Sequence, residues 1–214
     1  IPVSTLHARL GHPGSKTLKR ALSAYPTIKA SGTLSTLCDP CLRGKSKRRP
    51  FGRTFSRSYE PLEFLSADIQ YFSTRANDGT STNCKIIDHA TRYLKTFLLP
   101  DRSAESLLMD LKPFVARMER QSGKLIKFIR TDQGGEFSGV VLDFLADKGI
   151  VRQKSTPYYH IDPGMAEHAH QTVLYMARSL LISSNLPICF YGDAILTATY
   201  LHNRLIHTGA SKTP

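Results

Sequence analysis

Three acidic residues stand where they could hold catalytic metal ions. Asp68 interrupts the largely apolar stretch LEFLSADIQYF, and Asp132 directly follows the apolar run KLIKFIRT. Glu167 lies in DPGMAEHAHQ, at the start of an expected helix, with 34 residues between it and Asp132. A carboxylate in a buried strand needs a compensating cation, and oxygen ligands suit Mg²⁺ or Mn²⁺. The three acids therefore predict a two-metal site of the kind that promotes in-line displacement at phosphorus.

The spacing of these acids alone leaves a second interpretation open. Asp68 could be held in a salt bridge, Asp132 could cap a turn, and Glu167 could be solvated. Gly134 and Gly135 follow Asp132 closely. They are expected to let the backbone turn beside the metal site, although a simple turn would use them in the same way.

A second group of residues has the chemistry of a structural zinc site. His7 and His12 enclose four residues, and Cys38 and Cys41 form a C-x-x-C pair 25 residues later. Two imidazoles and two thiolates are a ligand set that tetrahedral Zn²⁺ accepts. A region of about 40 residues can hardly build its own core, so a bound metal would stabilise it. The alternative is a capping histidine, a solvated histidine and two unpaired thiols, and we favour zinc.

The positive charge is concentrated at the beginning of the chain. Net charge is +12, of which residues 1–59, with 12 Lys/Arg and one acid, supply +11. This asymmetry favours a nucleic-acid-binding arm, with improved solubility as the alternative. Non-specific phosphate contacts are expected from the basic residues of this arm: Arg43, Lys45, Lys47, Arg48 and Arg49. Arg152 and Lys154, just before the helix that carries Glu167, are further candidates for DNA contact, and could equally be solvated.

The elements that must position these residues follow from the hydrophobic pattern. Expected strands cover 62–72, 83–89, 92–99, 124–131 and 150–155. Expected helices cover an apolar face from Leu107 to Met118 with Ser103 as N-cap, then 137–149, 164–184 and 188–207. Pro113 should kink or divide the first of these helices. The order indicates an α/β protein with a mixed sheet covered by helices.

Composition and cysteine usage exclude several other classes of protein. The four cysteines do not form the framework of a secreted disulfide-rich domain. No apolar run approaches the roughly 20 residues that a transmembrane helix needs, and the first residues do not form a signal peptide. The chain begins without Met and ends abruptly at GASKTP, so we expect a piece of a longer chain.

Several motifs in order resemble the integrase region of copia-type LTR retrotransposons over nearly the whole chain. They are LHARLGH with CDPCLRGKSKRRPF, then PLEFLSAD, IDHATRYLKTFLL, IRTDQGGEF and STPYYHIDPGMAE. The resemblance implies a zinc-binding pre-integrase module at 1–42, a basic linker at 43–60 and an RNase H-like catalytic core at 61–214. It further implies that Asp68, Asp132 and Glu167 are the catalytic ligands of Mg²⁺ or Mn²⁺, and that the His/Cys group holds Zn²⁺.

The resemblance also implies an activity and partners. The family cleaves nucleotides from element DNA ends and joins the 3′-hydroxyls to target DNA, so the chain would be a polynucleotidyl transferase and endonuclease. Double-stranded DNA, both element ends and host target, would be its substrate. It would act as a homo-oligomer, derive from a larger Gag-Pol polyprotein, and lie in a cytoplasmic particle before import into the nucleus. No membrane association is expected.

The sequence departs from the family around Glu167. The family usually has Asn-Gly-x-Ala-Glu-Arg there, followed by another Asn, whereas this chain has DPGMAEH with His170 at the position of that Asn. The family's C-terminal DNA-binding region is missing. An alternative is therefore a catalytically silent or domesticated relic that binds zinc and nucleic acid. An RNase H-type nuclease would share the core but would leave the His/Cys group unexplained.

Overall fold

The chain folds into two compact units that are described separately. The computed structural model describes residues 1–33, 38–45, 59–72, 74–132, 134–154, 163–207 and 211–214, and only the backbone of 163–167. A sheet unit comprises residues 52–170, and a helical unit comprises residues 1–51 together with 171–214. The expected domain boundaries at residues 42 and 60 stay a prediction, and most of the expected linker lies outside the described residues.

The sheet unit is built on five strands. They are β1 (Phe64–Tyr71), β2 (Thr82–Asp88), β3 (Leu94–Leu99), β4 (Phe128–Thr131) and β5 (Val151–Lys154). Their order in the sheet is β3-β2-β1-β4-β5; β1, β2 and β3 pair antiparallel, while β1, β4 and β5 pair parallel. This arrangement confirms the predicted mixed, RNase H-like sheet.

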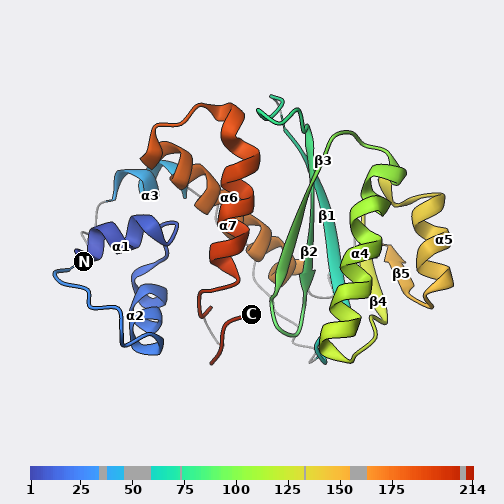
Figure 1. Ribbon diagram of the computed structural model, residues 1–214, viewed down its shortest axis with the longest axis horizontal. Helices are drawn as coiled ribbons and strands as arrows, with labels where there is room; N and C mark the ends of the chain where they lie inside the picture. Colours follow the sequence, from blue (N-terminus) through green and yellow to red (C-terminus); the bar gives the residue numbers. More distant parts are fainter. Residues whose placement is uncertain (34–37, 46–58, 73, 133, 155–162, 208–210) are drawn as a thin grey trace. The chain divides into compact units, whose positions relative to one another are not determined.

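Two helices cover one face of this sheet, α4 (Ala104–Ser122) and α5 (Val140–Asp147) (Figure 1). Alternate residues of β1, namely Leu65, Ala67 and Ile69, enter the core with apolar side chains of both helices. The period of two places the intervening residues of β1 on the other face. The core therefore fixes which face of β1 carries Asp68.

Local signals account for the bounds of these elements. Ser103 caps α4 as predicted, since its side chain accepts a hydrogen bond from the Ser106 backbone N–H at 3.1 Å. Pro113 does not divide α4, which runs unbroken over 19 residues. The predicted helix at 137–149 begins only at Val140, because Gly135–Phe137 forms a 3-10 turn, η1. Strand β4 begins at Phe128 rather than at residue 124.

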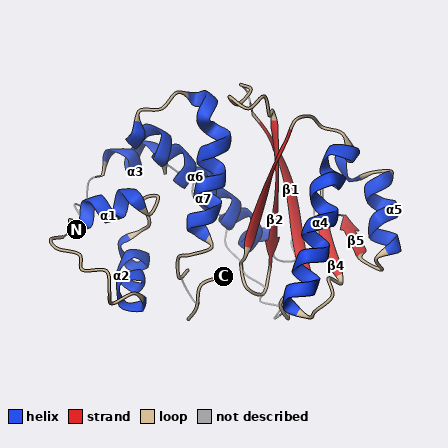
Figure 2. Ribbon diagram, viewed as in Figure 1, coloured by secondary structure: helices blue, strands red, loops and turns tan. Residues whose placement is uncertain are grey.

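The helical unit contains helices and connecting loops in its described part (Figure 2). Its elements are α1 (Val3–Arg9), α2 (Ser15–Ala24), α3 (Asp39–Gly44), the second part of α6 (Pro163–Ser184), η2 (Ile188–Phe190) and α7 (Tyr191–His202). The last two predicted helices are thereby confirmed, with η2 preceding α7. None of the described helices has the length and apolar character that crossing a membrane would require.

Close contacts join the N-terminal helices of this unit to α6 and α7. Ser179 on α6 donates a hydrogen bond to the backbone oxygen of Pro40 at 3.2 Å. Gly44 lies so near that a Cβ there would stand 2.6 Å from Ser179 Oγ. A Cβ on Gly11 would stand 2.9 Å from Met176 Cε. The region around the His/Cys group therefore packs against the end of the chain.

Candidate functional site

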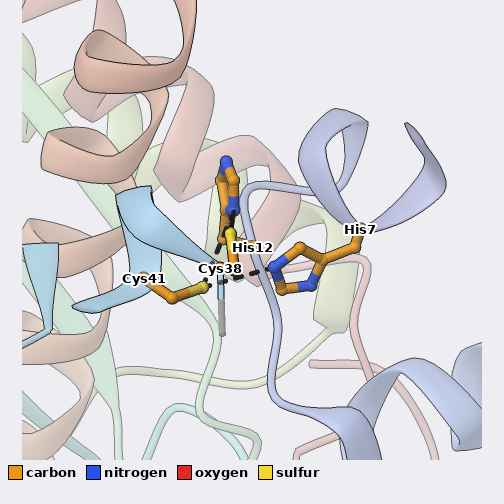
Figure 3. A group of neighbouring side chains, drawn as sticks. All are labelled: His7, His12, Cys38 and Cys41. Carbon is orange, nitrogen blue, oxygen red and sulfur yellow. Dashed lines mark hydrogen bonds between the residues drawn. The ribbon is translucent and has the colours of Figure 1, made fainter. Parts of the chain in front are cut away.

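The predicted zinc ligands converge in the helical unit (Figure 3). One ligand atom from each of His7, His12, Cys38 and Cys41 lies within 4.8 Å of the others. Sulfur–nitrogen distances are 3.3 Å for Cys41–His7, 3.3 Å for Cys38–His12 and 3.7 Å for Cys41–His12. Tetrahedral Zn²⁺ with ordinary bond lengths would separate its ligands by about 3.5 Å. The geometry therefore fits one zinc ion held by all four residues.

The backbone around the two histidines explains this convergence. Gly11 and His12 both have left-handed conformations, with φ of 71° and 59°. This turn ends α1 and returns the chain, so that the His12 N–H donates to the His7 carbonyl at 2.8 Å. Glycine meets the backbone requirement at position 11 without steric cost. Cys38 and Cys41, at the N-terminal end of α3, supply both sulfur ligands from one helical turn.

The surroundings favour the metal-binding forms of the histidines. Burial, and after it the charges of His7 and Lys45, lowers the pKa of His12 to about 4. Burial, then the charge of Lys45, also lowers the pKa of His7. Both imidazoles are therefore neutral at pH 7, the form that a metal requires. Burial raises the pKa of the Cys41 thiol, while the charge of Lys45 opposes this effect.

In the sheet unit, the register aligns two of the predicted catalytic acids. The parallel pairs of β1 and β4 end with Ser66 opposite Arg130. Continued by two residues, the same offset brings Asp132 level with Asp68, on the face away from the helical core. Both carboxylates also act on one buried group, since burial and then the charges of Asp68 and Asp132 raise the pKa of Cys84. Both acids therefore lie within electrostatic reach of Cys84.

Asp68 has two cationic or polar neighbours that are distant in the sequence. His170 Nδ1 lies 3.2 Å from Asp68 Oδ2. Lys85 stands directly opposite Asp68 on β2, is 0% exposed, and donates a hydrogen bond to Gln70 Oε1. From the sequence, the negative charge of Asp68 was expected to need compensation by a metal ion or by a side chain distant in the sequence. Lys85 and His170 are such side chains. They do not fill the site, because the Asp68 side chain is still 42% exposed.

Replacing Lys85 with methionine is expected to stabilise the protein at neutral pH. Burial lowers the pKa of Lys85 to about 8 from its ordinary 10.5, partly opposed by Asp68. Between these values the unfolded chain binds more protons, so the free energy of unfolding rises with pH from about 8 to 10.5. Lys85→Met should remove this rise and add about 1–3 kcal/mol at pH 7, because Asp68 keeps access to water.

Urea denaturation at a series of pH values measures the effect of Lys85→Met. Lys148→Met is the matched control, since Lys148 is exposed at the end of α5, and its pH profile should follow the parent. A rise between pH 8 and 10.5 that persists in Lys85→Met would assign that rise to another group.

The Asp132 carboxylate accepts a hydrogen bond that closes a turn, and it still has an oxygen available to a metal ion. Its Oδ1 accepts a hydrogen bond from the Gly134 N–H at 3.1 Å, and Asp132 itself is exposed. The turn and metal interpretations are therefore compatible. The prediction that Gly134 and Gly135 provide backbone freedom for the turn is wrong. Gly134 has φ −59° and ψ 147°, which other residues adopt, and Gly135 does not have positive φ. Space is limited at Gly134, because a Cβ there would clash with Glu136 Oε2 and stand 3.1 Å from Asp132 Oδ1, so the Glu136 carboxylate would have to shift from its bond with Tyr71.

Gly134→Ala and Gly135→Ala are expected to differ sharply. The first forces apart the carboxylates of Asp132 and Glu136 and should destabilise the protein by about 1–3 kcal/mol. A Cβ on Gly135 meets nothing within 4 Å, so its loss of stability should stay within about 0.5 kcal/mol. Thermal unfolding of the two variants beside the parent tests this. Equal losses would contradict the assignment of crowding to position 134.

The third predicted acid, Glu167, lies in the first part of α6, and its side chain is outside the described residues. Among the described side chains, the His/Cys group is the one set of three or more metal-binding residues that converge. The ligand set formed by Asp68, Asp132 and Glu167 therefore stays a prediction.

The residues expected to contact DNA have different surroundings. Arg43 is exposed and pairs with Asp39 at 3.6 Å, while Lys45 donates to the His12 backbone oxygen beside the zinc ligands. Lys154 is exposed at the end of β5. Lys47, Arg48 and Arg49 lie outside the described residues. Arg152 donates three hydrogen bonds within the chain, and DNA contact by any of these residues stays a prediction.

Sequence reasoning missed three residues around the acids. Glu136, 5% exposed, accepts a hydrogen bond from the Tyr71 hydroxyl, and this bond is the main cause that raises the pKa of Tyr71 to about 12. Lys85 could have been recognised from the sequence, because it is the one cation within the expected strand NCKIID. Glu136 and Tyr71 are 65 positions apart, and no local pattern joins them.

Comparison with known proteins finds relatives over nearly the whole chain. It is 31% identical over 210 residues to the retrovirus-related Pol polyprotein from transposon TNT 1-94 of Nicotiana tabacum, covering 95% of this chain and 15% of that polyprotein. It is 30% identical over 204 residues to the Pol polyprotein from transposon RE2 of Arabidopsis thaliana, covering 94% and 14%. The chain thus spans about one seventh of the length of these relatives. No family model matches it.

Proposed function

This chain belongs to the integrase region of copia-type retrotransposon Pol polyproteins, to which it is homologous over 95% of its length, and we propose that it cleaves and joins DNA strands. The reaction is divalent-metal-dependent cleavage at the ends of element DNA, followed by transfer of the 3′-hydroxyls into host DNA. Asp68, Asp132 and Glu167 are the proposed ligands. The observation that carries the proposal is the parallel register of β1 and β4, whose last pair, Ser66 with Arg130, stands two residues before Asp68 and Asp132 on each strand.

The acids are suited to hold metal on the face of the sheet away from α4 and α5. Two Mg²⁺ or Mn²⁺ ions, when bound, supply stabilisation of charge on the attacking and leaving oxygens at phosphorus. Asp68 is fixed within β1, where it pairs with Lys85 of β2. Asp132 is held at the end of β4 by its own turn. The positive charge of Lys85 limits the repulsion between the carboxylates while no metal is bound.

The partners are proposed on the basis of charge and relationship. The basic residues of the first 59 positions would contact DNA phosphates without sequence preference. The zinc group would hold the N-terminal helices folded rather than take part in the reaction. The relatives are Pol polyproteins, so this chain would be released from a larger precursor, assemble as a homo-oligomer and act on chromosomal DNA in the nucleus.

The test is strand transfer in vitro with the zinc-loaded protein, Mn²⁺, a plasmid and a labelled duplex that ends like an element terminus. Joined product supports the proposal. Cleavage of an RNA–DNA hybrid without joining would indicate a nuclease instead. Salt-sensitive duplex binding without either reaction would favour a silent nucleic-acid-binding module.

A further inference from the structure

Arg152 on β5 binds the segment that carries Asp132 at three points. Its Nε donates to Thr131 Oγ1, one terminal nitrogen donates to the Phe137 carbonyl, and the other donates to the Asp132 carbonyl, all at 2.8 Å. The acceptors therefore lie on both sides of the turn at Asp132. A planar guanidinium can satisfy such a fixed set of acceptors, whereas a single ammonium group cannot.

The far end of the same turn has a second anchor. Glu136 accepts a hydrogen bond from Tyr71, the last residue of β1, and the Arg102 guanidinium lies 3.6 Å from the centroid of the Tyr71 ring. Within the turn, the Phe137 N–H donates to the Gly134 carbonyl at 3.2 Å. Arg152 thus ties Thr131, Asp132 and Phe137 to β5, and Tyr71 ties Glu136 to β1.

Arg152 and the Asp132 carboxylate belong to opposite faces of the sheet. Arg152 pairs in register with Ile129, a core residue, and its bond to Thr131 lies on that same core side. β4 ends at Thr131; its alternation, continued by one residue, directs the Asp132 side chain to the opposite side, and the register continued two residues past Ser66 and Arg130 brings it level with Asp68. Arg152 thus holds the backbone of Asp132 from behind and leaves its carboxylate unobstructed.

We propose that Arg152 is a positioning residue that fixes Asp132 for binding of a divalent cation, rather than a DNA contact. The inference rests on the proposed function, because it needs Asp132 to be a metal ligand. Three of the five N–H groups of the guanidinium are already used within the chain. Lys154, two residues later on the same strand, is exposed and is better placed to reach a phosphate.

The expected consequence is a loss of metal affinity without a loss of DNA affinity. Outer-shell partners that orient metal ligands are worth about 10- to 100-fold in affinity. Arg152→Gln should weaken the Mn²⁺ binding that depends on Asp132 by about this factor. Lys154→Gln removes the same charge from the same strand. It should leave Mn²⁺ affinity unchanged and weaken binding to duplex DNA, with a smaller dependence on salt.

The experiment is titration of Mn²⁺ into zinc-loaded protein, followed by electron paramagnetic resonance of the free ion. The parent, Arg152→Gln, Lys154→Gln and Asp132→Asn are compared, the last defining which binding belongs to Asp132. Duplex affinity and the unfolding temperature are measured on the same samples. Thr131→Val preserves side-chain shape but removes two hydrogen bonds, the one that Thr131 accepts from Arg152 and the one that its hydroxyl donates to the Asp132 carbonyl at 2.9 Å. It should weaken Mn²⁺ binding by about 2- to 10-fold and is the second variant if Arg152→Gln does not fold.

The outcomes are distinguishable. Weaker Mn²⁺ binding with unchanged duplex affinity supports the inference. Unchanged Mn²⁺ binding in Arg152→Gln, or in Thr131→Val where Arg152→Gln does not fold, overturns it. Weaker duplex binding with unchanged Mn²⁺ affinity would make Arg152 a DNA contact instead. A parent without any Mn²⁺ binding sensitive to Asp132→Asn would refute the proposed metal site itself, and the inference with it.

Discussion

Asp132→Asn is expected to reduce Mn²⁺-dependent strand transfer by at least about 10³-fold, which corresponds to about 4 kcal/mol of transition-state stabilisation. The substitution removes the negative charge that a divalent cation requires. Asparagine retains a side-chain oxygen that can accept the hydrogen bond from the Gly134 N–H. The turn should therefore persist, and the loss should appear in the reaction rate and in Mn²⁺ affinity, while the unfolding temperature stays close to that of the parent.

Asp147→Asn is the matched control for this variant. Asp147 is exposed at the end of α5 and undergoes the same change of charge and shape, so its strand-transfer rate should equal that of the parent. Product formation is measured over time on a labelled duplex at saturating DNA. If Asp132→Asn joins DNA as fast as Asp147→Asn does, Asp132 is a turn-forming residue only, and the two-metal assignment loses its second ligand.

Much of the sheet unit could be predicted from sequence because its signals are local. The alternation of apolar residues in β1 and the cap at Ser103 are readable within a few positions. Element bounds were less predictable, since the run before β4 contains Ile126, whose N–H donates to Glu119 Oε1 instead of joining the sheet. Pro113 was expected to kink or divide α4; the helix is not divided, and it packs its apolar face on the sheet on both sides of Pro113.

The three acids could be predicted from the sequence because of their residue type. The contacts that hold them in place could not be predicted in this way. Nothing near Asp68 in the sequence indicates Lys85 or His170, because register and folding bring them together. Arg152 has a charge that suggests DNA, while its three acceptors come from another strand and its turn. Gly134 was attributed to backbone freedom, although the requirement comes from the Glu136 carboxylate. Such contacts depend on tertiary packing, which composition and periodicity do not describe.

Cys41→Ser is expected to prevent zinc binding and to unfold the N-terminal helices. Apparent binding free energies for structural zinc are about 10–16 kcal/mol at neutral pH, more than three short helices recover by packing alone. The hydroxyl is a poor replacement for a thiolate that lies 3.3 Å from His7 and 3.7 Å from His12. Zinc content should fall from one ion per chain to none, and circular dichroism should lose helical signal. Addition of a strong chelator to the parent should have the same effect.

Cys189→Ser separates loss of the metal from loss of a thiol. Cys189 lies in η2 of the same helical unit and outside the ligand group, so this variant should bind zinc as the parent does. The contacts of Ser179 with Pro40 and Gly44 extend the prediction to α6. Once α3 is lost, amide hydrogen exchange in residues 176–184 should accelerate in Cys41→Ser and in chelated parent, and not in Cys189→Ser. Exchange that stays slow without zinc would mean that the helical unit is held by its apolar packing and that the metal is not required for its fold.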